Sequence, residues 1–212
     1  MADGDWLRID ERTDVLVSLI ECIECIRRVS EEPAFWKWAI LSMHSALQGA
    51  MVCHLSGTAQ LGALSKKSWV ETIEWHEKDH QQAAGDDAIE SERKPERDAF
   101  PDQRLADPAT LFERLYRKTK RCEGAGEPLE VMPAQRSSFR RLNNLRRQFA
   151  HFAPAGWSIE LAGLPRMLLD VLAVIDAIAS DPWPFRHMEY ADKQRLGRIL
   201  KELRLELEAI NL

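Results

Sequence analysis

The spacing of its apolar residues constrains the fold of this chain most, because they recur at steps of three and four along most of it. This spacing places apolar side chains on one face of an α-helix, whereas a strand requires alternation. The segment from residue 10 to 29 shows the pattern with Val15, Leu16, Leu19, Cys22, Ile23 and Ile26. With no alternating pattern and no internal repeat, the sequence predicts an all-α helical bundle of about six to seven helices.

Proline and glycine residues separate the periodic segments and predict where the helices begin and end. The expected helices span residues 10–29, 34–55, 66–80, 108–122, 134–152, 164–179 and 190–210. The second is apolar nearly all round, which predicts a place at the centre of a single domain covering residues 1–212. Residues 81–104 combine acidic residues, glycine and proline with few apolar side chains, which predicts a flexible acidic loop.

Four of the seven tryptophans receive a structural interpretation. Trp36, Trp38 and Trp69 fall within periodic helical segments and are expected in the core. Trp157 follows the predicted break at 154–156, where it is expected to brace the end of the helix 134–152.

Composition excludes some classes of protein. A net charge of −5 and a pI near 5.7 argue against a broadly basic nucleic-acid-binding protein, although a local basic site remains compatible with them. No apolar run approaches the roughly 18 residues of a membrane helix, and the acidic N-terminus does not resemble a signal peptide. We therefore expect a soluble, cytoplasmic protein whose four cysteines (Cys22, Cys25, Cys53, Cys122) are reduced thiols.

The helix expected at 134–152 carries the most distinctive polar pattern. On a helical wheel its core face holds Phe139, Leu142, Leu145, Phe149 and Phe152. The opposite face holds Arg140, Asn144, Arg147 and His151, at steps of four, three and four. Arg146 lies at the flank of the core face, from which it reaches this polar row only if the helix end loosens.

These side chains suit the chemistry of a phosphodiester. An arginine presents a planar fork of donors that matches a phosphate, and a histidine exchanges a proton near neutral pH. Together they could bind RNA, stabilise the developing phosphorane charge and assist attack by a ribose 2′-hydroxyl, a reaction that needs neither metal nor cofactor. The alternative interpretation is a solvated helix face, which is what such charge blocks usually form.

The segment Leu145-Arg146-Arg147-Gln148-Phe149-Ala150-His151-Phe152 resembles the signature of the HEPN superfamily, an arginine followed after four to six residues by a histidine late in a helical bundle. Members are all-α domains that commonly dimerise, and many are metal-independent ribonucleases of toxin–antitoxin and defence systems. Others are catalytically silent interaction modules.

The resemblance implies a homodimeric endoribonuclease with Arg146, Arg147 and His151 as catalytic residues. Arg146 and Arg147 would neutralise the scissile phosphate, His151 would act as general base or transition-state donor, and Arg140 and Asn144 would extend the RNA contact. Active members often carry a small polar residue directly after the first arginine. Here that residue is Arg147, so either Arg147 takes part of the phosphate role or the active geometry is lost. The alternative is a non-catalytic module of the same fold that binds a nucleotide, an antitoxin or another protein partner.

Two further patterns suggest metal sites. His76-Glu77-Lys78-Asp79-His80 matches the zinc-protease pattern H-E-x-x-H, but its charged middle positions favour a solvated helix end. The cysteines Cys22 and Cys25, with Cys53 and His54, invite a zinc interpretation, yet they lie in apolar helices where a free cysteine behaves as a small apolar residue. We therefore predict no metal site.

Overall fold

The computed structural model describes residues 6–86, 99–120, 125–151 and 156–210, and these residues are mainly helical. They contain seven α-helices and no β-strand, apart from one isolated antiparallel bridge between Leu64 and Leu105. The helices are α1 (Glu11–Arg28), α2 (Phe35–Leu55), α3 (Lys66–Asp86), α4 (Pro108–Tyr116), α5 (Pro133–Ala150), α6 (Leu164–Ser180) and α7 (Tyr190–Glu208), and a short 3₁₀ helix, η1 (Lys118–Lys120), follows α4. The predicted all-α class is confirmed.

Two of the predicted boundaries are wrong. α3 continues beyond His80 to Asp86, into the segment expected to be a loop. The residues after His80 begin Gln-Gln-Ala-Ala, which are good helix formers despite their lack of an apolar face. α4 ends at Tyr116 instead of continuing to residue 122, and η1 tightens the chain after it. The rest of the predicted acidic loop, from 87 to 98, and Cys122 lie outside the described residues.

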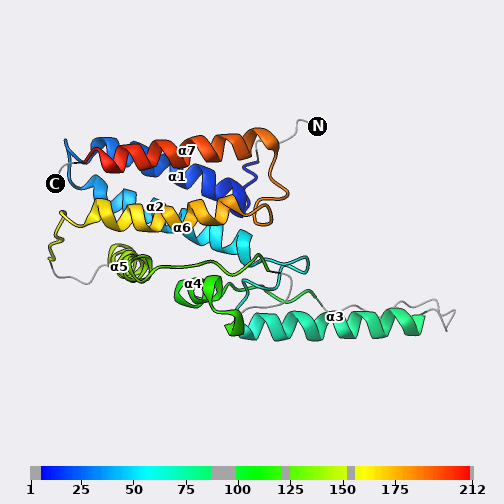
Figure 1. Ribbon diagram of the computed structural model, residues 1–212. Coiled ribbons are helices and arrows are strands. Elements are labelled where there is room, and N and C mark those ends of the chain that lie inside the picture. Colours follow the sequence, from blue (N-terminus) through cyan, green and yellow to red (C-terminus); the bar gives the residue numbers. More distant parts are fainter. Residues whose placement is uncertain (1–5, 87–98, 121–124, 152–155, 211–212) are drawn as a thin grey trace.

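The core is built around α2, as its apolar composition predicts. α2 packs against α1, α4, α5 and α6, while α7 covers α1 and α6. In Figure 1, α1, α2, α6 and α7 run side by side, whereas α5 is seen nearly end-on and so crosses this layer. The side chains of Leu47, Leu142 and Leu168 from three of these helices are completely buried.

α3 differs from the other helices because it packs against no other helix in the described part of the chain. Figure 1 shows α3 extending away from the bundle, beside the non-helical segment that precedes α4. Hydrogen bonds and aromatic contacts attach it to that segment. Ser68 Oγ accepts from the Arg104 backbone N–H (3.0 Å) and donates to the Asp102 carbonyl (3.5 Å), and the Trp75 ring meets the Phe100 ring edge-on with centroids 5.0 Å apart.

The tryptophan predictions were partly right. Trp36 is buried, but Trp38 and Trp69 are 51% and 38% exposed, so their predicted place in the core is wrong. Trp69 is exposed because no described helix covers α3. The exposed ring of Trp38 has the Lys37 ammonium 4.7 Å from its centroid. Trp157 does brace the end of α5, since its ring lies 5.0 Å from that of Phe149.

The described helices include none that is both long enough and apolar enough to cross a membrane.

Candidate functional site

The candidate site lies on α5, which is held firmly by its apolar face. Pro133 occupies its first turn, where a missing N–H costs nothing. Further along, Phe139 and Leu142 are buried, and the Phe139 ring stacks on Phe112 with centroids 3.9 Å apart. Ser138 Oγ adds a hydrogen bond of 2.7 Å to the Asp170 carboxylate on α6. Packing of this kind fixes the direction in which the polar face of the helix points.

The structure places four of the predicted residues together on the solvent-facing side of α5. Arg140, Asn144, Arg147 and His151 are all exposed and follow one another at helical spacing. His151 is the C-cap: its backbone N–H donates to the Arg147 carbonyl at 3.0 Å, and its φ of −131° and ψ of 76° leave the helical region. Its imidazole therefore projects from a helix end. We name these four residues the α5 polar row.

Three arginines of α5 form no ion pair within the part of the chain that the structure describes. Elsewhere arginines are neutralised, as where Arg27 contacts Glu202 (2.6 Å) and Glu206 (2.8 Å). By contrast, no carboxylate among the described residues pairs with Arg140, Arg146 or Arg147. Arg140 and Arg147 therefore form a local cationic surface in a chain whose net charge is negative.

Arg146, the first arginine of the motif, does not join the polar row. It is half-buried and borders a cavity of about 670 Å³ between α1, α2 and α5. His44 and Ser45 of α2 and Asp14 of α1 line the same cavity. Arg146 and His151 thus lie on different sides of α5.

His44 is the residue that sequence reasoning missed. It is 4% exposed, and its Nε2 donates to Asn143 Oδ1 at 3.1 Å. Burial lowers the pKa of the His44 imidazole, the nearby Arg146 guanidinium lowers it further, and the bond to Asn143 opposes both effects. The signal was present in the sequence, because an imidazole within a mainly apolar helix is an informative polar group when it is buried.

The two metal-like patterns form no ligand cluster. Among the residues that the structure describes, no group of three or more His, Cys, Asp or Glu side chains could hold a metal ion. His76 and His80 are exposed on α3, and the His76 ring contacts Phe100. Cys22 and Cys25 are buried in α1, where burial raises the pKa of both thiols, that of Cys25 to about 12.

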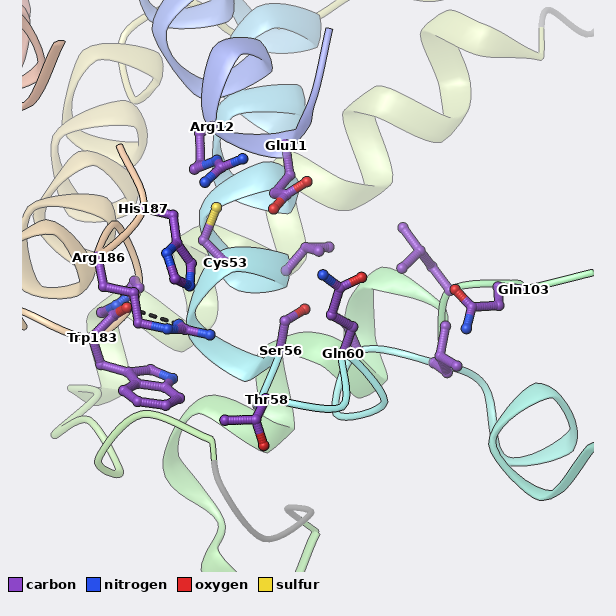
Figure 2. A pocket seen from close by; sticks show the side chains of 16 residues that line it. Glu11, Arg12, Cys53, Ser56, Thr58, Gln60, Gln103, Trp183, Arg186 and His187 are labelled. Carbon is purple, nitrogen blue, oxygen red and sulfur yellow. Dashed lines mark hydrogen bonds between the residues drawn. The ribbon is translucent and has the colours of Figure 1, made fainter. Parts of the chain in front are cut away.

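A second cavity, of about 690 Å³, lies where the start of α1, the end of α2 and the α6–α7 connection meet. Figure 2 shows Glu11 at the top of the view, Arg186 and His187 at the left, and Ser56 and Gln60 below Glu11. The Arg186 guanidinium lies 3.8 Å from the Trp183 ring centroid and donates to the Trp183 carbonyl, so its position is fixed. None of the α5 residues borders this cavity.

No family model, no curated protein and no solved structure matches this chain. The resemblance to the HEPN superfamily therefore rests on the residues of α5 and their place in an all-α protein.

Proposed function

We propose that this protein is a HEPN-like, metal-independent endoribonuclease that acts as a homodimer. The observation that carries the proposal is the exposed α5 polar row, whose arginines pair with no carboxylate among the described residues and whose histidine is the C-cap of the helix. An unneutralised cationic site beside a free imidazole is suited to an anionic substrate and to proton transfer.

In the proposed reaction, Arg146 and Arg147 hold the scissile phosphate and stabilise its transition-state charge. His151 takes the proton of the adjacent ribose 2′-hydroxyl as the 2′-oxygen bonds to phosphorus. The bond to the 5′-oxygen breaks and that oxygen takes a proton from solvent water, so the products carry a 2′,3′-cyclic phosphate and a 5′-hydroxyl. Arg140 and Asn144, further along α5, contact the neighbouring part of the RNA.

A homodimer would bring together an arginine and a histidine that a single chain keeps apart. Arg146 and His151 lie on different sides of α5, so one helix does not present both to one phosphate. A second copy that brings its own α5 against the first supplies the missing group. In this arrangement the arginine and the histidine at each phosphate come from different chains.

The test is cleavage of end-labelled RNA by the purified protein in EDTA, with mass spectrometry of the product ends. We expect the wild type to leave 2′,3′-cyclic phosphates and His151→Ala to cleave roughly 10²- to 10⁴-fold more slowly. Arg146→Ala should also be impaired, whereas His80→Ala, an exposed histidine on α3, is the matched control. Folding of each variant is checked by circular dichroism.

No cleavage of varied RNAs, or cleavage that survives both α5 substitutions, would refute the nuclease proposal. Mixing His151→Ala with Arg146→Ala protein tests the dimer separately. A site shared between chains predicts that activity partly returns in the mixture.

The second candidate function is a non-catalytic module that binds a nucleotide. The cavity around Arg186 favours it, because a fixed guanidinium facing polar side chains suits a small anionic ligand. A thermal shift with adenosine monophosphate that is lost in Arg186→Gln would support this candidate. No shift at any nucleotide concentration would count against it.

A further inference from the structure

An apolar pocket of about 460 Å³ lies at the C-terminal end of α5, within one helical turn of Arg146. Phe149 of α5 and Trp157, Ile159 and Leu161 of the following segment line it, together with Trp36 of α2. Trp36 is buried, whereas Trp157 is 37% exposed and the Phe149 and Trp157 rings meet at a tilt of 51°. The lining is mainly apolar, with three aromatic residues among its eight, and Trp157 gives the pocket a ring that is partly open to solvent.

Three residues at steps of three connect this pocket with the cationic part of α5. Asn143 bonds to His44, Arg146 borders the cavity beside His44, and Phe149 borders the apolar pocket. Residues three apart on a helix have Cβ atoms roughly 5–6 Å apart. An anion held by Arg146 thus lies next to the mouth of the apolar pocket.

We propose that this pocket receives one unstacked nucleobase of a single-stranded RNA whose phosphate is held by Arg146, an inference that rests on the proposed function. The chemistry of the pocket and that of Arg146 together indicate the occupant. A flat apolar group enters the pocket, and the anion attached to it meets the Arg146 guanidinium, which has no carboxylate partner among the described residues. A nucleotide carries both groups within one residue. Stacking on aromatic side chains is the usual way in which proteins hold unpaired bases.

The proposal requires a base that is not already paired. A base within an A-form duplex is stacked and paired, and its phosphate would approach Arg146 without any group to fill the pocket. Single-stranded RNA therefore binds better than the same sequence in a duplex.

The experiment measures binding without cleavage. The probe is a fluorescently labelled 2′-O-methyl oligoadenylate, which lacks the attacking hydroxyl, and its partner probe is the same backbone with abasic positions. We expect wild-type protein to bind the abasic probe roughly 5- to 150-fold more weakly, the range that stacking of one base represents. Trp157→Leu should bind the intact probe with a similar loss and should no longer distinguish the two probes.

The matched control is Trp69→Leu, because Trp69 is 38% exposed on α3 and lies outside the pocket. Trp157→Phe keeps a stacking ring and should restore most of the affinity, which separates stacking from damage to the end of α5. Equal binding of intact and abasic probes by the wild type, or discrimination that Trp157→Leu retains, would overturn the proposal, as would failure to bind the intact probe.

The same proteins separate this inference from the proposed function. Cleavage in EDTA without discrimination between intact and abasic probes would support the nuclease proposal and contradict the base-pocket proposal. Base discrimination dependent on Trp157 without any cleavage would retain the pocket in a protein that binds RNA but does not cut it.

Discussion

α3 and α5 each carry a histidine pattern near their C-terminal part, but they are attached to the protein in opposite ways. α5 packs its apolar face against α2, α4 and α6, whereas α3 packs against no other described helix and is held by hydrogen bonds and aromatic contacts to the segment before α4. The difference shows that a pattern of functional residues defines a site only where packing fixes the position of the helix that carries it. Side chains on α5 keep their positions relative to a neighbouring helix, as His44 and Asn143 show.

The largest effect is expected from the apolar anchor of α5. Leu142 is completely buried, so Leu142→Ala should lower the free energy of unfolding by roughly 2–5 kcal/mol through lost burial and a cavity. Ile73→Ala on α3, where the side chain is only half-buried, should cost less. Urea denaturation of both variants measures the difference. Equal costs would mean that α3 is packed as tightly as α5, and the comparison would fail.

The polar attachment of α3 should give the next largest effect. Ser68→Ala removes the acceptor of the Arg104 N–H in a part-buried hydrogen bond, at a cost of roughly 0.5–1.5 kcal/mol. Because Ser68 joins α3 to the segment before α4, hydrogen exchange should accelerate in α3 and stay unchanged in α5. Acceleration spread evenly over the two helices would show that α3 unfolds only together with the bundle.

The sequence predicted the core face of α5 and its exposed polar row, because one helix viewed alone determines both. It did not predict that Trp69 is exposed, since periodicity identifies an apolar face without saying what covers it. Nor did it place His44 beside Arg146. Their proximity involves two helices and depends on how α5 crosses α2, which no spacing along the chain encodes.

A smaller effect is expected from His44, and it depends on pH. The folded-state pKa of this imidazole lies below its ordinary value of 6.5, so protonation favours the unfolded chain. The stabilisation is complete above about pH 6.5 and is lost as the pH falls toward the lower folded-state pKa, at no more than ~1.4 kcal/mol per pH unit.

His44→Gln keeps a donor for Asn143 and does not titrate, so its stability should fall less steeply below this pH. Urea denaturation at several pH values compares it with the exposed His187→Gln. A slope for His44→Gln equal to that of the wild type would show that His44 is not buried as a neutral imidazole.

The smallest effect on stability should come from Arg147, which is exposed and pairs with no carboxylate in the described part of the chain. Arg147→Gln should change the free energy of unfolding by at most ~0.5 kcal/mol. The same substitution should reduce the salt dependence of single-stranded RNA binding by about 0.7 in the slope of log affinity against log salt, because one phosphate contact disappears. Arg195 on α7 is also exposed and forms no ion pair with a carboxylate among the described residues. Arg195→Gln should therefore leave the slope unchanged. An equal change in both variants would mean that RNA binding depends only on the overall charge of the protein. The surface of α5 would then bind RNA no more specifically than that of α7.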